Sequence, residues 1–262
     1  MTAAVPDPSR RAVVLGAGPA GLAAALALVR ARVPVTLVEA GPVVGGLCVT
    51  TERDGFTYDL GGHILFVHDA ARESWLRELL GADLIRVDRP VACIVGGQVR
   101  RGRYFDQAGP LAATPPVPPP PTVSAREYLT GLYEAGDPVV EDVVAYMEKV
   151  DGASVDAITG ARCHKLFAEQ YAPDGWWYPA GGVGQLMDAM ARAIRAGGGE
   201  ILTEHMARRI VLTGTGAVGG VEIADPSGAV LTLPADALVA GVADGLVLHL
   251  LGWDPPEGLP AR

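Results

Sequence analysis

Near the N-terminus lies the pattern that most restricts how this chain can fold. The apolar run Ala12–Leu15 is followed at once by Gly16-Ala17-Gly18-Pro19-Ala20-Gly21, a G-x-G-x-x-G turn. A short apolar run of this kind is typical of a parallel strand that is buried on both faces. The three glycines permit, in turn, a sharp bend, a close approach of a pyrophosphate to the backbone, and tight packing of a helix on the sheet. We expect a helix over Ala20–Ala31 that directs its N-terminal N–H groups and its positive dipole end at phosphates.

A second strand and an acidic residue complete this unit. Val35–Val38 is another short apolar run, and Glu39 follows it, 23 positions after Gly16. In dinucleotide-binding βαβ units, an acidic residue at this kind of spacing binds the ribose hydroxyls. A G-x-G-x-x-G turn by itself also joins strands and helices that bind nothing, but here the strand, the helix and the acid all agree. The sequence therefore predicts a dinucleotide site.

The composition excludes one class of partner and permits a sizeable core. The chain has 262 residues, of which 49% are hydrophobic, and its formal net charge is -9 at pH 7. Nucleic-acid binding draws mainly on clustered Lys and Arg, so no nucleic-acid partner is expected. The longest apolar run, Leu22–Val29, is far shorter than the ~20 residues that a membrane span requires, and the N-terminus lacks the apolar stretch of a signal peptide. We expect a soluble protein without a membrane span.

Several kinds of site find no support in the sequence. The five histidines do not fall at metal-ligand spacing, and there is no GxSxG, HExxH or P-loop motif. No metal site is expected. The three cysteines, Cys48, Cys93 and Cys163, are odd in number, widely spaced and without a CxxC motif. This usage favours a reducing compartment and hence a cytoplasmic protein.

Two further segments carry glycine pairs. The stretch EAGPVVGGLCVTTERDGFTYDLGGHILF contains Gly45-Gly46 and Gly61-Gly62, and YPAGGVGQL occupies Tyr178–Leu186. With the first turn, these segments closely resemble the flavoenzyme superfamily of amine oxidases, protoporphyrinogen oxidases and phytoene desaturases, including its UDP-galactopyranose mutase-like branch. The resemblance covers Arg11–Phe66 and resumes over Trp176–Leu212. It implies that the dinucleotide is FAD.

The resemblance also implies roles for individual residues. In that family, the loop after the ribose acid covers the FAD diphosphate, and the D-x-GG-H segment reaches the isoalloxazine ring. His63 is then the one titratable residue near the ring, and a loop histidine bonded to backbone is the alternative. Many members have Arg at the position of Leu47, which leaves one phosphate contact open. The backbone of Met206 would meet adenine, with ordinary core packing as the alternative.

The implied site residues form two sets. The cofactor-binding set comprises Gly16, Gly18, Pro19, Ala20, Gly21, Glu39, Ala40, Gly45, Gly46, Leu47, Gly61, Gly62, His63 and Met206. The set beside the flavin or substrate comprises Tyr178, Gly181 and Gly182. His63 is the one candidate catalytic residue, because a flavin carries the electrons itself.

The rest of the chain predicts a two-part α/β architecture. Apolar spacing predicts helices over 70–80, 124–133 and 138–150, and a hairpin of 91–95 with 98–104. The segment 109–124 contains seven prolines and predicts a semi-rigid spacer. Later strands, which resemble the β-meander that completes the family's FAD domain, are expected over 200–203, 207–212, 218–224, 229–233 and 237–240. We predict a Rossmann-like FAD-binding domain with a parallel sheet and a β-meander over 1–88 and 181–262, and an inserted, mainly helical substrate or cap region over 89–180.

The implied activity is that of an FAD-dependent oxidoreductase that oxidises a mainly apolar or alicyclic small molecule by hydride transfer to the flavin. Family members are considerably longer, so the resemblance implies that a C-terminal half is absent here, which leaves a sheet edge uncovered. Three alternatives stay open: a non-catalytic flavin- or dinucleotide-binding module, one half of a split enzyme, and a flavin-dependent mutase acting on a nucleotide sugar. We expect a homodimer, or a second chain that covers the open side.

Overall fold

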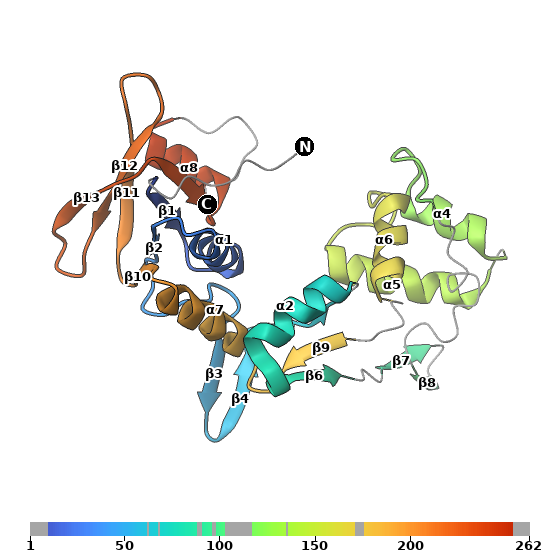
Figure 1. Cartoon of the computed structure of the whole chain (residues 1–262). Coiled ribbons are helices and arrows are strands. Elements are labelled where there is room, and N and C mark those ends of the chain that lie inside the picture. Colours follow the sequence, from blue (N-terminus) through green and yellow to red (C-terminus); the bar gives the residue numbers. More distant parts are fainter. Residues whose placement is uncertain are drawn as a thin grey trace. The chain divides into compact units, whose positions relative to one another are not determined.

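A computed structural model describes residues 10–61, 63–67, 69–87, 91–95, 98–102, 117–134, 136–170 and 176–253. The chain divides into two units, and each is considered by itself (Figure 1). The first comprises Met1–His63, Trp75–Ile85 and Tyr178–Arg262, and the second comprises Ile64–Ser74 and Arg86–Trp177. The two units therefore divide after residues 63, 74, 85 and 177, and the sequence predicts domain boundaries after 88 and 180.

Four parallel strands form the main sheet of the first unit. Across the sheet they are β10 (Glu200–Leu202), β2 (Val35–Val38), β1 (Ala12–Leu15) and β14 (Ala237–Ala240). All four residues of β1 are buried, as the unbroken apolar run predicts for a strand covered on both faces. Because β1 and β2 pair in parallel with Leu15 opposite Val38, their carboxyl ends lie side by side. Gly16 and Glu39, the residues that follow these strands, are therefore neighbours.

Two helices of the first unit pack against one another. They are α1 (Pro19–Arg30) and α7 (Gly184–Ala196), which lie side by side in Figure 1. On α1 the buried side includes Leu22, Ala25 and Leu26, spaced as one helical face. On α7 the buried residues are Leu186, Met187, Ala189, Met190, Ala191 and Ile194. The helix α7 begins directly after the segment Tyr178–Val183, whose first five residues form the YPAGG turn.

The later strands divide between two sheets, which corrects one expectation. Only β11 (Met206–Leu212), β12 (Val218–Ala224) and β13 (Val230–Pro234) form an antiparallel meander. The first and last of the five expected strands, β10 and β14, join the parallel sheet instead. The meander and the parallel sheet share a core of Val13, Leu15, Val38, Ile210, Val221, Ile223, Ala235 and Leu250. The last of these residues belongs to α8 (Asp244–Leu251), a helix that the sequence reading missed.

A hairpin follows the loop that carries Gly45 and Gly46. Its strands are β3 (Thr50–Arg53) and β4 (Phe56–Asp59), joined by Asp54 and Gly55. Both turn residues have positive φ, 53° for Asp54 and 79° for Gly55, which is the requirement of a two-residue type I′ turn. The Asp-Gly pair is the sequence signal that predicts such a hairpin.

Short elements connect this hairpin to the later part of the chain. After β5 (Leu65–Phe66), α2 (Ala70–Leu80) spans the residues predicted for it and leads through the 3-10 turn η1 (Gly81–Asp83) to β6 (Leu84–Val87). The strand β9 (Trp176–Pro179) lies between β5 and β6 in a three-stranded sheet.

The second unit contains a helical cluster and a hairpin. The helices are α4 (Ala125–Leu132), α5 (Pro138–Asp151) and α6 (Gly160–Gln170), and α6 was not predicted. Ser124 caps α4 in a capping box with Glu127, as its position predicts. The core of this helical cluster includes Leu129, Val143, Met147, Val155 and Cys163. The hairpin pairs β7 (Val91–Val95) with β8 (Gln98–Gly102); its expected turn at Gly96-Gly97, and 109–116 of the proline-rich segment, lie outside the described residues.

Candidate functional site

The glycine turn after β1 is held by close backbone contacts. Gly16 has a φ of +85°, and its N–H donates to Val38 O at 2.8 Å. A Cβ on Gly16 would lie 2.7 Å from a Val242 methyl carbon, and one on Gly21 would overlap the carbonyl oxygen of Gly16. These two glycines are therefore required by the fold, Gly16 for its backbone angle and Gly21 for the close packing of α1 on the turn.

Gly18 differs from its two neighbours in the motif. Its φ of −71° and ψ of 178° are extended values that any residue adopts, and a Cβ there would meet nothing within 4 Å. It is the N-cap of α1 and provides no side-chain cap, and Pro19 follows it at the first helical turn. No atom of the described chain requires glycine at this position. An anion that lay against the first N–H groups of α1 would require it, because a side chain would take up the space of the anion.

A second glycine loop contacts the first. Gly45 donates its N–H to Ala17 O at 2.7 Å, and a Cβ on Gly46 would lie 3.2 Å from Gly18 Cα. Both residues have positive φ, 121° and 57°. The Gly45-Gly46 loop and the first glycine turn therefore meet next to the open space at Gly18. The side chain of Leu47, which follows this loop, is 81% exposed.

Glu39 is tied into the same turn through both carboxylate oxygens. Oε2 accepts from the backbone N–H of Ala17 and Oε1 from that of Gly41, each at 2.7 Å. These bonds fix the carboxylate at the carboxyl edge of the sheet. Each oxygen keeps further lone-pair capacity, so the group can still accept hydrogen bonds from a ligand.

A pocket of about 710 Å³ opens beside Glu39. Of the predicted contacts, Gly16, Glu39, Ala40 and Met206 line it. Met206 is 48% exposed, so the alternative of ordinary core packing is wrong. The remaining lining includes His205 and Arg208 on or next to β11, and Val242, Asp244 and His249 at α8, none of which the sequence reading identified. The run Ala243-Asp244-Gly245 after a short apolar strand was the available signal for this second strand-to-helix turn.

The ring of His205 has a defined orientation in this pocket. Its Nδ1 lies 2.7 Å from the carbonyl oxygen of Thr203, and because a carbonyl only accepts, Nδ1 carries the proton. Its backbone N–H donates to Glu39 O at 2.9 Å. The residue therefore couples the start of the meander to the strand end that carries Glu39.

The segment with the third glycine pair lies at the end of β4. Gly61 is exposed, Gly62 lies outside the described residues, and the Nδ1 atom of His63 is buried without a hydrogen-bond partner among the described residues. A Cβ on Gly61 would lie 3.3 Å from Cε1 of the His63 ring. A buried, unpaired ring nitrogen is costly unless a ligand or water satisfies it, which makes His63 a candidate contact for a bound group.

The YPAGG turn lies against the hairpin. Tyr178 donates its hydroxyl to Asp59, and Gly181 donates its N–H to Gln185 Oε1 at 2.9 Å. Gly182 has a φ of +89°, and a Cβ there would overlap Thr50. Burial, followed by the hydrogen bond to Asp59, raises the pKa of Tyr178 to about 12. The hydroxyl is therefore a hydrogen-bond donor to Asp59 at neutral pH.

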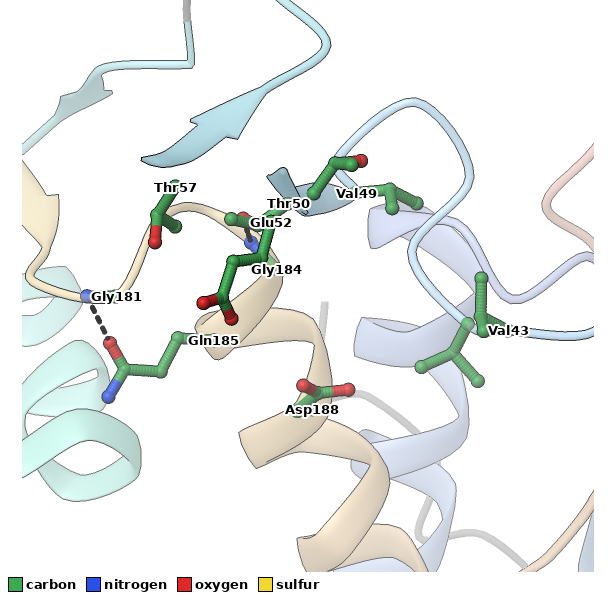
Figure 2. A pocket seen from close by; sticks show the side chains of 11 residues that line it. Val43, Val49, Thr50, Glu52, Thr57, Gly181, Gly184, Gln185 and Asp188 are labelled. Carbon is green, nitrogen blue, oxygen red and sulfur yellow. Dashed lines mark hydrogen bonds between the residues drawn. The ribbon is translucent and has the colours of Figure 1, made fainter. Parts of the chain in front are cut away.

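A second pocket, of about 470 Å³, lies between the β3–β4 hairpin and the first turns of α7 (Figure 2). Its polar lining comes from the hairpin and the helix: Thr50, Thr51, Glu52, Thr57, Gln185 and Asp188. Gln185 is fixed there, since its Nε2 donates to Asp83 at 2.6 Å. Among the predicted site residues, Gly181 alone lines this pocket.

Two kinds of feature are missing from the part of the chain that the structure describes. It contains no group of three or more His, Cys, Asp or Glu side chains that could hold a metal ion. Nor does it contain a helix with the length and apolarity needed to cross a membrane. Cys48 and Cys163 are free thiols.

Comparison with known sequences identifies the dinucleotide-binding element. Residues 14–80 match the family described as NAD(P)-binding Rossmann-like domain. The 4,4'-diapolycopene oxygenase of Methylomonas sp is 46% identical over 57 residues, which are 22% of this chain and 12% of that protein. The lycopene-forming phytoene desaturase of Paracoccus sp. (strain N81106 / MBIC 01143) is 37% identical over 78 residues, 30% of this chain and 15% of that protein.

Solved structures share the fold over almost the whole chain. An oxidoreductase from Methanosarcina mazei matches with a TM-score of 0.76 and 19% identity, over 95% of this chain and 62% of that one. A putrescine oxidase bound to putrescine matches with a TM-score of 0.65 and 20% identity, over 94% of this chain and 61% of that one. A reduced UDP-galactopyranose mutase matches with a TM-score of 0.63 and 18% identity, over 95% of this chain and 58% of that one. The Rossmann-like α/β fold is thereby confirmed, as is the resemblance to this group of enzymes. The chain spans about three fifths of the length of these structures.

Proposed function

We propose that this chain is the FAD-binding part of a flavin-dependent oxidoreductase that acts on a mainly apolar or alicyclic small molecule. The observation that carries the proposal is the open space at Gly18, whose missing side chain serves no contact within the described chain. It lies next to Gly46 and at the start of α1, where a diphosphate is well placed to accept N–H groups. The names of the relatives support the reaction class.

The residues present fit each part of the cofactor. The pocket beside Glu39 would hold the adenosine, with the carboxylate accepting from the ribose hydroxyls and the Met206 backbone next to adenine. Gly18 and the Gly45-Gly46 loop would face the diphosphate. At the other end, the unpaired Nδ1 of His63 would bond the flavin or a substrate oxygen.

FAD bound in this way supplies a two-electron acceptor for hydride from substrate. The chain itself binds and orients it. His63 is the candidate catalytic group, and its role would be to hold a hydrogen bond or a proton at Nδ1. A reducing, cytoplasmic compartment is part of the proposal and is consistent with the free thiols of Cys48 and Cys163.

The first test is cofactor uptake by the purified chain. We expect visible flavin absorbance in the protein as purified, or after incubation with FAD followed by gel filtration, at up to one FAD per chain. NAD should bind weakly, because it lacks the isoalloxazine ring that the segment with Gly61 and His63 is proposed to contact. Tight NADH binding without flavin uptake would show that the dinucleotide was assigned wrongly.

Replacement of Glu39 tests the ribose contact. Glu39→Ala should weaken FAD binding by roughly 1–3 kcal/mol, because a charge-assisted bond to the ribose hydroxyls is lost. Glu39→Gln should have a smaller effect, since the amide oxygen can still accept. Glu52→Ala is the matched control, because this acid lines the other pocket and should leave the dissociation constant unchanged. Equal FAD affinity in folded Glu39→Ala and wild-type protein, measured by flavin fluorescence titration, would contradict the assignment.

We also propose that the free edge of the parallel sheet recruits a partner, either a second copy or the other part of a split enzyme. Among the residues that the structure describes, the strand β14 is at the edge of the sheet and pairs with β1 alone. Ala237 and Gly241 direct their backbone N–H groups toward β1. Because successive residues of a strand direct their N–H groups to opposite sides, those of Leu238 and Ala240 point away from β1. Unpaired N–H and C=O groups along such an edge can pair with a strand of another chain.

The isolated chain should therefore self-associate or aggregate on concentration. Ala240→Pro removes an outward N–H without removing a bond to β1, and it should reduce the association seen by sedimentation and light scattering. A wild-type chain that stays a stable monomer at high concentration and holds stoichiometric FAD would refute the partner proposal. Because flavin content is measured on the same sample, this outcome is separate from a failure to bind FAD.

A further inference from the structure

Asp59 is the centre of a hydrogen-bond network that joins the β3–β4 hairpin to the distant segment Tyr178–Val183. It is the last residue of β4, and its side chain is half-buried. Its Oδ1 accepts from the Thr50 hydroxyl at 2.6 Å, and its Oδ2 accepts from the Tyr178 hydroxyl. The backbone N–H of Val183 lies 3.1 and 3.2 Å from the two oxygens. One carboxylate thus contacts β3, the end of β9 and the start of α7.

Thr50 closes the network from the other side. While its hydroxyl donates to Asp59, it accepts from the backbone N–H of Gly184 at 2.8 Å. A Cβ on Gly182 would overlap Thr50 and lie 2.9 Å from Asp59 Oδ1. The YPAGG turn therefore fits against the hairpin only without a side chain at 182, which gives this glycine a structural reason that is independent of any ligand.

The charge of Asp59 suits its position. The first backbone N–H groups of a helix have no partner within the helix and carry the positive end of its dipole, so a carboxylate stabilises the start of α7. Tyr178 donates to the same carboxylate, and burial together with Asp59 keeps this phenol protonated, with a pKa of about 12. Burial and the charge of Asp59 also raise the pKa of Cys48.

The network ends directly before the candidate flavin-facing residues. Asp59 precedes Gly61 by two positions and His63 by four, and His63 is the residue with the buried, unpaired Nδ1. A carboxylate anchored by three donor groups, two hydroxyls and one backbone N–H, fixes where this short segment leaves β4. The position of the Gly61–His63 segment relative to the YPAGG turn is therefore set by the side chain of Asp59.

We infer that Asp59 is a positioning residue, whose carboxylate holds the segment with Gly61 and His63 in register with the YPAGG turn and so arranges the flavin-facing end of the site. The part of the inference that concerns flavin rests on the proposed function. The part that concerns His63 and Tyr178 does not, so the two can fail separately.

The test compares Asp59→Asn with Asp83→Asn in the full chain. Asparagine keeps the size of the side chain and one acceptor oxygen but removes the charge. Asp83 is the matched control, because its side chain also bonds to the first turn of α7, through Gln185, and forms no hydrogen bond with Thr50 or Tyr178 in the described part of the chain. If the loss of any acid near this helix were the cause, both variants would show the same changes. If the hydrogen-bond network of Asp59 is the cause, only Asp59→Asn should show them.

Two readouts need no cofactor. In Asp59→Asn the ionisation of Tyr178, followed by tyrosinate absorbance and assigned by its absence in Tyr178→Phe, should shift below about 12, with burial preventing a full return to the ordinary value. The NMR signals of the His63 imidazole should also move. Neither change is expected in Asp83→Asn. An unchanged Tyr178 titration together with unmoved His63 signals would overturn the inference, whether or not the chain binds FAD.

A third readout applies to protein loaded with FAD. Asp59→Asn should change the shape of the visible flavin band and weaken FAD binding roughly tenfold, as for the loss of one charge-assisted bond. An identical band and affinity would refute the link to the flavin end. If Asp59→Asn does not fold, Tyr178→Phe, which removes one donor, should move the same His63 signals to a smaller extent, and unmoved signals there would again contradict the inference.

Discussion

Gly18→Val is expected to abolish cofactor retention while leaving the protein folded. The extended φ and ψ of Gly18 suit valine, and a Cβ there meets no atom of the described chain within 4 Å. The added carbons would instead occupy the space proposed for the diphosphate. Overpacking at a contact costs about 3 kcal/mol, which corresponds to a roughly hundredfold loss of FAD affinity. Flavin absorbance after gel filtration and a fluorescence titration measure it.

Gly214→Val is the control for this substitution. Gly214 also has open space at its Cβ and no positive φ, but it lies in the turn between β11 and β12, away from the residues that line the pocket beside Glu39. Its FAD affinity should equal that of the wild type. If Gly18→Val still copurifies with flavin, the diphosphate is bound elsewhere and the central observation of the proposed function loses its meaning.

Gly21→Ala is expected to have the opposite profile, with a large loss of stability whether or not a cofactor is present. Replacing a glycine by alanine inside an exposed helix ordinarily stabilises by roughly 0.5–1 kcal/mol. Here the new Cβ would overlap the carbonyl oxygen of Gly16, a backbone atom that cannot rotate away. We expect the free energy of unfolding to fall by about 3 kcal/mol or more, because α1 must shift away from the turn.

The sign of the effect makes this experiment decisive. Gly131→Ala, in the helix α4 with nothing within 4 Å of its Cβ, is the matched control and should be neutral or stabilising. Urea unfolding of the cofactor-free chain, followed by circular dichroism, measures both. A Gly21→Ala chain as stable as wild type would show that α1 does not pack this closely on the turn.

Together these two variants separate the roles within one motif. Gly18 is proposed to serve a ligand, and Gly21 serves the packing of the chain on itself. The letters G-x-G-x-x-G do not distinguish the two, because both positions simply demand the smallest residue. The distinction comes from what surrounds each Cβ direction in three dimensions.

Local patterns determined the start of the chain and its candidate dinucleotide site. The run Ala12–Leu15, the glycine turn, α1 and Glu39 follow one another within a single βαβ unit, and each depends on short-range preferences. Parallel pairing in register then places Glu39 beside the turn without further information. The capping box at Ser124 and the helix α2 were predictable for the same reason.

Pairing between distant segments was decided only by the tertiary structure. The short apolar runs of β10 and β14 predict strands but do not encode their neighbours, and the shared core with the parallel sheet places them there rather than in the meander. The pocket lining from α8 depends on that placement, since the helix follows β14 directly.

The hydrogen bonds around Asp59 likewise could not be predicted from the sequence. Asp59 and Thr50 are 9 positions apart, but Asp59 and Tyr178 are 119 apart, and single polar side chains leave no periodic signal in a sequence. Hydrogen bonds form wherever donors and acceptors are brought together, and that is fixed by the packing of the hairpin on the start of α7. The sequence by itself therefore determined the first glycine turn and the acid that follows β2. The tertiary structure decided which strands share a sheet and which side chain joins the two later glycine motifs, because these depend on contacts that only the folded chain creates.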